Sequence, residues 1–333
     1  MSTTNAVDMK HSHTEYSELQ IEEIGRSVIS SIFQRRCIID SKPGEEINPV
    51  SEEEITPHLE RVMLAIASNR PIEMVLPAFP GKSPNRKKTL SHLPDYAERC
   101  AIDQLNRLCE EIRAVYPRGA KIKICSDGYV FSDVVKIPDN QVKDYTDAIS
   151  EYCSINYPDV FSMYDLIDEF KELKCLNSMR EELIVRYGVS FMTLKMRVKE
   201  EKEAGSMYKG ITRFLCEDYS GLSEFEGWSN TQIQKAARAA AYRVMQRSEA
   251  WSELLNEKFP NFVRLSIHPQ FRVSKKIGIK LVPTSDLWRT PWHSVAVKTG
   301  ECVQLERRSN VDERFNSLVF NGGMPCHYVR LSV

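Results

Sequence analysis

The sequence lacks long apolar stretches. No segment approaches the roughly 20 apolar residues that a membrane-spanning helix requires. Residues 1–18 are polar and contain no hydrophobic core of a signal peptide. We therefore expect no membrane span and no secretion signal, with a disordered lead-in over residues 1–18 and a single domain over residues 19–333.

An excess of charge of either sign is also missing. Forty-five lysines and arginines stand against 46 aspartates and glutamates, which gives a formal net charge of −1. This balance argues against binding to nucleic acid through bulk phosphate neutralisation. The nine cysteines are odd in number and form no Cys-x-x-Cys pair, which predicts reduced thiols and a cytoplasmic location.

Familiar catalytic signatures are absent. The chain has no Gly-x-Gly-x-x-Gly, no Walker phosphate loop, no Gly-x-Ser-x-Gly elbow and no His-Glu-x-x-His. The facial triad of an iron oxygenase would need a His-x-Asp pair, whereas His293 is followed by Ser294 and Val295. Because the other histidines are dispersed, we predict no metal site.

What the chain does contain is a strand, loop, helix and strand in succession. "IEMVLPAF", residues 72–79, reads as a buried strand, and apolar residues recur every three or four positions over residues 93–115. A second strand is expected near residues 122–125. Such a βαβ pattern implies a parallel pair, and the loops at the carboxyl ends of parallel strands are where α/β sheets bind ligands.

The rest of the chain divides by composition. Residues 140–258 read as mostly helical, and the C-terminal third holds short β-branched runs such as "FVRLSIHP", "IGIKLV", "SVAVK" and "HYVRLSV". We predict an α/β fold with a Rossmann-like, mostly parallel sheet as its core. Added helices would include an insertion around residues 140–258, and the C-terminal strands would extend the same sheet.

Short polar groups follow the two predicted strands. In "GKSPN", Lys82, Ser83 and Asn85 offer an ammonium, a hydroxyl and an amide that suit a phosphate, although a solvated basic loop has the same composition. Asp127 in "SDG" could orient or deprotonate a substrate, or it could simply begin a turn. The three cations that follow, "RKK" at residues 86–88, are expected to be solvated or steering charges.

Two further polar groups lie later in the chain. "GITRFLCEDYS" contains Arg213 and Asp218, for which a surface ion pair is the simplest interpretation. "VRLSIHPQ" places His268 at the end of a predicted strand, and "TPWHSVAV" places His293 just before another. A histidine in such a position can act as a general acid or base, although a lone histidine is more often structural.

Taken together and in order, these motifs resemble a known family. The series "LPAFPGKSPN", "LPDYAE", "KIKICSDGYVF", "GITRFLCED", "VRLSIHP" and "TPWHSVAV" is similar to the isonitrile (isocyanide) synthases of the pyoverdine/dityrosine biosynthesis family, over about residues 71–298. One departure is Gly81, where many members carry a cysteine. A thiol at that position therefore has no role in this chain.

The resemblance implies a cofactor-free enzyme. It would be a carbon–carbon lyase that converts the α-amine of L-tyrosine or L-tryptophan into an isonitrile, with ribulose 5-phosphate as the carbon donor. The resemblance also implies a separate pathway oxygenase that uses Fe(II) and 2-oxoglutarate. Two alternatives stay open, namely N-formyl or N-acyl transfer to an aromatic amino acid, and a sensor that binds a sugar phosphate without turnover.

The resemblance also assigns expected roles. Lys82 and its loop would hold the phosphate, and Arg213 or Arg264 would hold the amino-acid carboxylate. The residues expected to be catalytic are Lys82, Asp127, His268 and His293. Those expected to bind substrate are Ser83, Asn85, Arg213, Asp218 and Arg264. An apolar pocket for the aromatic ring would include Phe79, Phe214 or Trp292.

Overall fold

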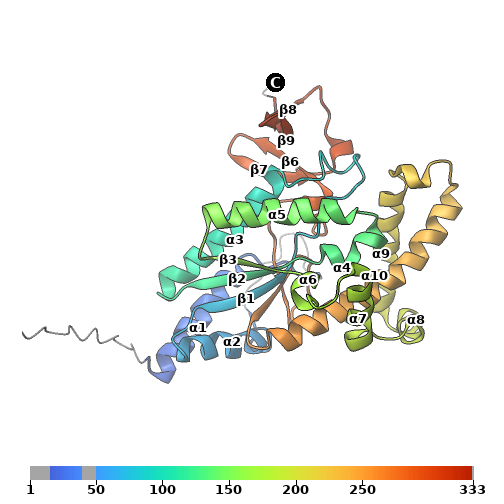
Figure 1. Ribbon diagram of the computed structural model, residues 1–333. Coiled ribbons are helices and arrows are strands. Elements are labelled where there is room, and N and C mark those ends of the chain that lie inside the picture. The colour runs from blue at the N-terminus through green and yellow to red at the C-terminus, as the bar shows by residue number, and fades with distance from the viewer. Residues whose placement is uncertain (1–15, 40–49, 332–333) are drawn as a thin grey trace, which may run out of the picture.

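The computed structural model describes residues 16–39 and 50–331. Its centre is a parallel sheet of five strands in the order β3-β2-β1-β4-β5 (Figure 1). The strands are β1 (Ile72–Pro77), β2 (Ala120–Cys125), β3 (Phe161–Tyr164), β4 (Val263–Ser266) and β5 (Ile277–Gly278). Because all of them run the same way, their carboxyl ends share one edge of the sheet, and the loops that follow them meet there.

Helices cover both faces of this sheet. Successive residues of a strand point to opposite faces, so Met74 and Leu76 pack in one hydrophobic cluster while Val75 and Cys125 pack in another. The first cluster joins the sheet to α1 (Glu18–Phe33), α2 (Glu52–Ala67), α3 (Tyr96–Val115) and α5 (Asp139–Asn156). The second joins it to α4 (Gly128–Val135), α6 (Leu166–Glu169), α7 (Leu176–Tyr187) and α10 (Asn230–Lys258).

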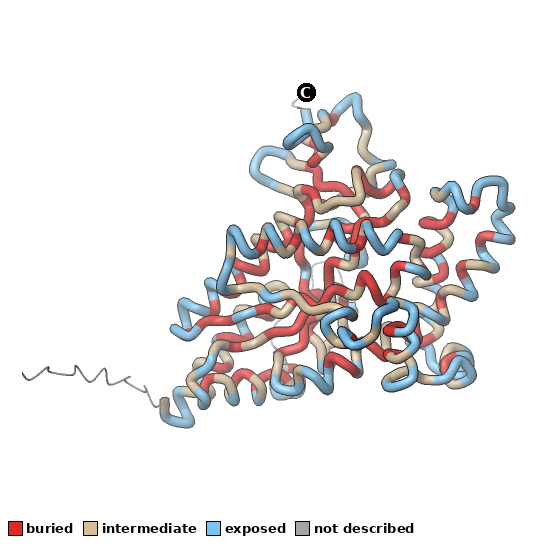
Figure 2. The backbone as a smooth tube through the Cα atoms, in the orientation of Figure 1, coloured by how far each residue is buried: buried red, intermediate tan, exposed pale blue. Residues whose placement is uncertain are grey.

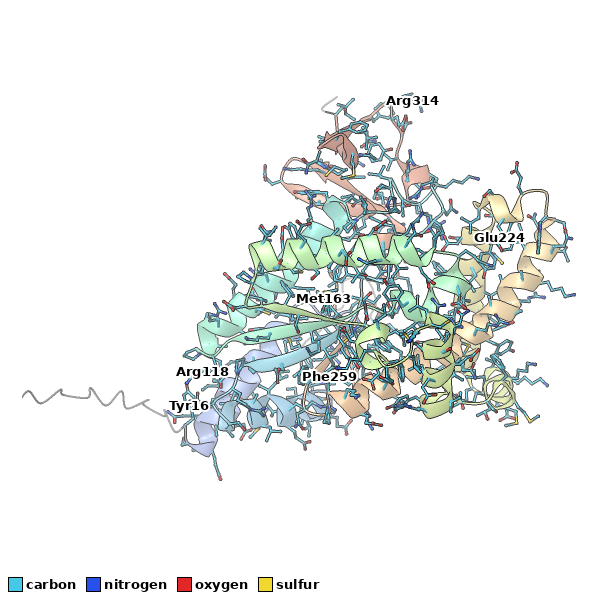
Figure 3. The ribbon with its side chains drawn as sticks, viewed as in Figure 1. Tyr16, Arg118, Met163, Glu224, Phe259 and Arg314 are labelled. Atoms are coloured by element: carbon cyan, nitrogen blue, oxygen red, sulfur yellow. The ribbon has the colours of Figure 1, made fainter. Side chains whose placement is uncertain are left out.

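Burial follows this layered arrangement. The buried backbone is concentrated in the central strands and the inner sides of the helices, while the outer helical turns are exposed (Figure 2). The long helix α10 lies against the second face, with α8 (Phe191–Glu200) and α9 (Lys202–Tyr219) beside it. Phe259, which Figure 3 labels, lies just after α10. Its ring packs against that of Tyr164 in β3 at a centroid distance of 5.3 Å.

The C-terminal strands form a separate sheet, so the prediction that they all extend the central one is wrong in part. Only β4 and β5 join it. The others form a four-stranded sheet, β7-β6-β9-β8, from β6 (Val295–Thr299), β7 (Cys302–Glu306), β8 (Asn316–Asn321) and β9 (Met324–Arg330). The physical reason is the edge strand β5, which has two residues and therefore offers too short a ladder for further pairing.

Two other boundaries differ from expectation. The mostly helical stretch around residues 140–258 contains β3, which pairs with β2 and forms an edge of the central sheet. Within the predicted lead-in, Ser17 caps α1 and Tyr16 packs near Tyr116 at a ring distance of 6.4 Å. Residues 16–18 therefore belong to the folded domain, and the rest of that lead-in lies outside the described residues.

Long apolar helices are not part of this fold. Across the described ranges, none of the helices combines the length and apolar character needed to cross a bilayer. All nine cysteines lie within these ranges and are free thiols.

Gly128 begins α4 at a point where the loops that follow β1 and β2 touch. A Cβ atom there would lie 2.2 Å from the Pro80 carbonyl oxygen and 2.6 Å from a methyl group of Val142. We expect Gly128→Ala to destabilise the fold by roughly 1–3 kcal/mol in urea unfolding, since backbone must move. In the matched control Gly210→Ala, a helical position with nothing within 4 Å, stability should be unchanged or slightly raised. Equal stability of the two variants would contradict the close approach.

Candidate active site

Most of the predicted site residues gather at the carboxyl edge of the central sheet. Lys82 follows β1, Asp127 follows β2 and His268 follows β4. His293 reaches the same region from η2 (Pro291–His293), a short 3-10 helix whose backbone is tied to the β1 loop by the bond from the Ser83 N–H to the Trp292 carbonyl oxygen, 2.9 Å. The shared edge of a parallel sheet therefore brings together segments that are far apart in the sequence.

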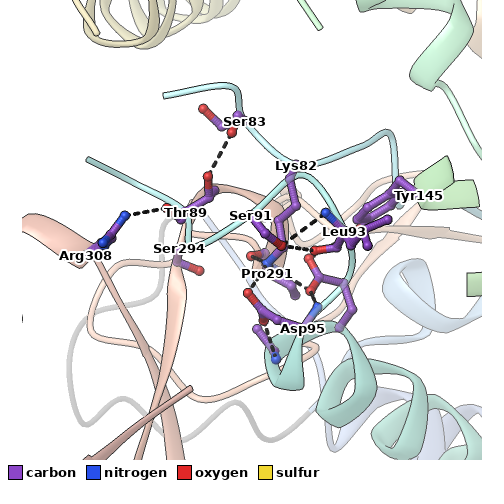
Figure 4. Close-up of polar contacts among 12 residues, drawn as sticks. Lys82, Ser83, Thr89, Ser91, Leu93, Asp95, Tyr145, Pro291, Ser294 and Arg308 are labelled. Atoms are coloured by element: carbon purple, nitrogen blue, oxygen red, sulfur yellow. Dashed lines mark hydrogen bonds and ion pairs between the residues drawn. The ribbon is translucent and has the colours of Figure 1, made fainter. Parts of the chain in front are cut away.

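Lys82 is completely enclosed. Its Nζ lies 2.7 Å from Asp95 Oδ2, 2.9 Å from Glu98 Oε2 and 3.2 Å from the Pro291 carbonyl oxygen (Figure 4). These contacts use all the donors of an ammonium group. A phosphate could contact Lys82 only if the ammonium left one of these partners.

The two carboxylates belong to the start of α3. Asp95 caps the helix by accepting from the Ala97 N–H at 2.9 Å, and Glu98 accepts from the Asp95 N–H at 2.9 Å, which is a capping box. The Tyr145 hydroxyl donates to Glu98 Oε1 at 3.2 Å. Burial raises the pKa of Glu98 to about 7, and the neighbouring charge of Asp95 adds to this while Lys82 opposes it.

Burial acts to lower the pKa of Lys82, but Asp95 and Glu98 outweigh it and raise that pKa above its ordinary value. Lys82 is therefore an ammonium group across the range in which enzymes work. One ammonium faces two acidic side chains, so the cluster can hold an additional proton on Glu98 near neutral pH.

A second buried cluster joins the β1 loop to α9. Asp218 Oδ1 accepts from Ser83 Oγ at 3.0 Å and lies 2.7 Å from Lys88 Nζ. Asn85 Nδ2 donates to the Glu217 carbonyl oxygen at 2.8 Å. Burial raises the pKa of Asp218, against the effects of Lys88 and Ser83. The simple interpretation of Asp218 as part of a surface ion pair with Arg213 is therefore wrong.

Besides Asp95 and Glu98, the partners of Lys82, sequence reasoning missed Lys88. It was expected to be a solvated charge, but it is buried, pairs with Asp218 and lies 4.8 Å over the ring of Phe214. No local signal in the sequence could have found it, because its partner Asp218 lies in α9, far along the chain. Arg213 is exposed on α9, and within the described part of the chain it forms no ion pair with Asp218.

Asp127 has an unused oxygen. It occupies the N-cap position of α4 without a capping hydrogen bond, and its Oδ1 is buried with no partner among the described residues. Gly128 does not adopt a positive φ. The turn explanation of "SDG" therefore leaves this side chain unexplained. Burial raises the pKa of Asp127 to about 7, where a carboxyl group can both accept and donate a proton.

The two histidines differ in exposure but are both kept neutral. His293 is half-buried, packs 4.7 Å from Phe214, and has no hydrogen-bond partner for Nδ1 within the described part of the chain. Burial, then the charge of Lys88, holds its pKa well below its usual range. Burial and Lys276 lower the pKa of His268 to about 4. The side chain of His268 is nevertheless exposed to solvent.

The expected aromatic pocket is only partly open. Phe79 and Trp292 pack together at 5.4 Å and are almost fully buried, so they belong to the core beneath the site. Phe214 is half-buried between Lys88 and His293. Phe79 also has a φ of 58°, which is strained for a bulky residue.

Comparison with known proteins shows which family this chain belongs to. A family model described as "Pyoverdine/dityrosine biosynthesis protein" matches residues 62–319. This chain belongs to that family. The L-tyrosine isonitrile synthase of Xenorhabdus nematophila is 40% identical to it over 93% of this chain and 92% of the relative. The L-tryptophan isonitrile synthase of Fischerella ambigua is 38% identical over 93% of this chain and 92% of the relative.

A solved structure agrees with the family assignment. The crystal structure of the PvcA protein from Pseudomonas aeruginosa is similar with a TM-score of 0.82 at 38% identity, covering 92% of this chain and 99% of that chain. The Rossmann-like α/β fold predicted from the sequence is therefore confirmed.

No metal centre accompanies these side chains. Within residues 16–39 and 50–331, the structure holds no group of three His, Cys, Asp or Glu side chains that could bind a metal ion. A hollow of about 200 Å³, lined by residues that include Arg61, Glu73 and Phe262, lies at the amino ends of β1 and β4. It is at the opposite edge of the sheet and is separate from the candidate active site.

Lys82→Met tests the enclosed cluster. Removing the ammonium leaves Asp95 and Glu98 uncompensated in a dry site, so we expect a loss of about 3–5 kcal/mol in the free energy of unfolding near pH 8. Glu98 binds its proton more tightly in the folded chain than in the unfolded chain, so its contribution to stability falls as pH rises from the unfolded pKa toward about 7. The loss should therefore be smaller at about pH 5.

The control for this prediction adds Glu98→Gln to Lys82→Met. With one negative charge removed, the double variant should recover part of the stability in denaturant unfolding at about pH 8. A loss that is the same at both pH values and is not relieved by Glu98→Gln would show that the cluster charges do not matter.

Proposed function

We propose that this chain is an isonitrile synthase that acts on the α-amine of L-tyrosine or L-tryptophan. The supporting observation is that Asp127 and His293, each with an unpartnered polar atom, stand at the carboxyl edge of the sheet in a member of this family. Relatives that carry the names L-tyrosine and L-tryptophan isonitrile synthase match nearly the whole chain. These relatives support an enzyme with an aromatic amino acid as substrate.

The carbon donor in this proposal is ribulose 5-phosphate. Its C2 ketone would condense with the amine of the amino acid to give an imine and water. Loss of phosphate and cleavage of both carbon–carbon bonds of C2, to C1 and to C3, would then leave C2 alone on the nitrogen as the isonitrile carbon, while C1 departs as a one-carbon fragment and C3 to C5 depart as a three-carbon fragment. The reaction class is that of a carbon–carbon lyase, and it needs proton transfers but no redox cofactor.

The titratable residues suit these proton transfers. Asp127, with a pKa raised to about 7, can take a proton from the amine and return one in a later step. His293 stays a neutral imidazole, so its ring N–H can donate a hydrogen bond to the substrate without bringing a positive charge into the site. We assign Lys82 a positioning role, because its ammonium group is already bound on all sides.

The remaining expectations complete the proposal. Free cysteines throughout the chain suit a reducing, cytoplasmic location. An isonitrile is a reactive product, and we propose a separate oxygenase that uses Fe(II) and 2-oxoglutarate as the next enzyme in the pathway.

The product assay tests the proposed function. Purified protein with ribulose 5-phosphate and either L-tyrosine or L-tryptophan should give a product with the infrared stretch of an isonitrile. Mass spectrometry separates this product from a formamide, which is heavier by one water. A formamide product would favour N-formyl transfer, and tight binding of the sugar phosphate without any turnover would favour a sensor.

Asp127→Asn tests the proposed base. We expect kcat/KM to fall by roughly 10²–10⁴ because the amide cannot take up a proton. In the unchanged enzyme, kcat/KM should rise as pH increases through about 7, the pKa of Asp127. The variant should lose this rise.

The matched control is Asp159→Asn, at an exposed position before β3. It should keep both the rate and the pH dependence. If Asp127→Asn retained the pH-dependent rise, the base would have to be another group.

A further inference from the structure

The register of β4 and β5 brings two cations side by side. Leu265 pairs with Ile277 in this parallel ladder, so the preceding residues, Arg264 and Lys276, are also neighbours and point to the same face of the sheet. Both side chains converge on Ser252 of α10. Arg264 Nη2 donates to Ser252 Oγ at 3.0 Å, and Lys276 Nζ donates to the same oxygen at 2.7 Å.

Within the part of the chain that the structure describes, these two cations have no carboxylate in ion-pair contact, although the charge of Glu253 acts on both of them from a longer distance. Among the described residues, neither Arg264 nor Lys276 has an acidic group within 4.0 Å, although Arg264 is buried and Lys276 is half-buried. Other buried or nearly buried cations have such partners, namely Lys82 with Asp95, Lys88 with Asp218, Arg36 with Glu54, Arg180 with Asp139 and Arg247 with Asp133.

Like charges on neighbouring strands repel, and burial increases the cost. Arg264 is compensated in part by the carbonyl oxygen of Ser252 and by Asn256 Oδ1, both at 3.0 Å. Lys276 has only the Ser252 hydroxyl. Burial and the charge of Arg264 lower the pKa of Lys276 to about 8. A bound anion would stabilise a buried pair of cations of this kind.

The pair lies next to the candidate active site. Along β4, Ser266 points to the same face as Arg264, and His268 follows two residues later. Ser266 Oγ accepts from the His268 N–H at 3.1 Å, and the charge of Lys276 contributes to the low pKa of His268. Arg264 and Lys276 therefore lie on the α10 side of the candidate active site, while the Lys82 and Lys88 clusters lie on the side of the β1 loop.

We propose that Arg264 and Lys276, together with the Ser252 hydroxyl, bind the phosphate group of the sugar phosphate; this inference rests on the proposed function. A phosphate monoester carries nearly two negative charges and three acceptor oxygens, so it matches two cations and a hydroxyl. The Lys82 donors are already occupied, and Lys88 is paired with Asp218. The competing anion for the pair is the carboxylate of the amino acid, which carries a single charge.

Lys276→Met is the variant that tests this inference, with Lys275→Met as its matched control. Lys275 is adjacent to Lys276 and exposed, so its substitution removes the same charge without changing the pair of Arg264 and Lys276. Calorimetry with inorganic phosphate and with ribulose 5-phosphate should show Kd raised at least about tenfold in Lys276→Met and unchanged in Lys275→Met. The KM for the amino acid should stay within about twofold.

Stability gives an independent readout. Because the variant removes one of two repelling cations, its thermal midpoint should equal or exceed that of the unchanged protein. Loss of phosphate binding at unchanged stability is the result expected of a ligand site. A structural lysine would give the reverse, with lower stability and intact phosphate binding.

Other outcomes decide between the two proposals. Unchanged phosphate binding in Lys276→Met overturns the phosphate site, even if the protein makes an isonitrile. Weaker amino-acid binding with intact phosphate binding assigns the pair to the carboxylate instead, and also overturns the inference. Absence of any isonitrile product, together with phosphate binding that depends on Lys276, would overturn the proposed function and leave the anion site standing.

A measurement on the unchanged protein covers the case in which Lys276→Met fails to fold. Trinitrobenzenesulfonate modifies neutral amines, and peptide mapping by mass spectrometry reports the modification of each lysine. Phosphate should slow the modification of Lys276 at least about threefold compared with chloride at equal ionic strength, and leave Lys275 unaffected. Equal modification of Lys276 in both salts would overturn the inference.

Discussion

The structure around the candidate active site depends on one buried ammonium group. Lys82 could not remain enclosed without Asp95 and Glu98, because a buried charge without partners costs several kcal/mol. The same two carboxylates form the capping box of α3, so the start of that helix and the path of the β1 loop are determined together. The Pro291 carbonyl oxygen adds η2 to this arrangement, and Tyr145 adds α5.

This constraint extends to the residues with free polar atoms. His293 lies in η2, whose position is fixed by Lys82 and by the Ser83 N–H. Asp127 follows Ser126, whose hydroxyl donates to the Phe79 carbonyl oxygen at 3.0 Å. The β1 loop therefore places a carboxyl group and an imidazole without using either of them, which leaves both available to a substrate.

The local parts of this design could be predicted from the sequence. Apolar residues repeat at the right spacing in α3 and in β1, so both elements and their parallel connection follow from periodicity. The separation of β6 to β9 into a second sheet could not be predicted in this way. It depends on β5 being only two residues long, and strand length at an edge is set by tertiary contacts rather than by β-branched residues.

The sequence also could not show which polar residues have atoms without a hydrogen-bond partner. Lys82 and Asp127 both follow strands and look equally suited to bind a ligand, but the partners of Lys82 come from α3 and η2, at positions that periodicity does not reveal. Lys88 was misjudged for the same reason, since Asp218 lies far along the chain.

Satisfied and unsatisfied polar groups therefore have different meanings in this fold. A buried charge with complete partners, such as Lys82, holds segments together, and its loss is expected to be felt first as instability. Among the described residues, a buried oxygen or nitrogen without a hydrogen-bond partner, as in Asp127 and His293, has a cost that the fold does not recover by itself, and so does a pair of cations without a carboxylate in contact, as in Arg264 and Lys276. Stability alone therefore gives no reason for such groups to be present. The position of Asp127 and His293 at the carboxyl edge of the parallel sheet is what supports a binding and catalytic role for that edge.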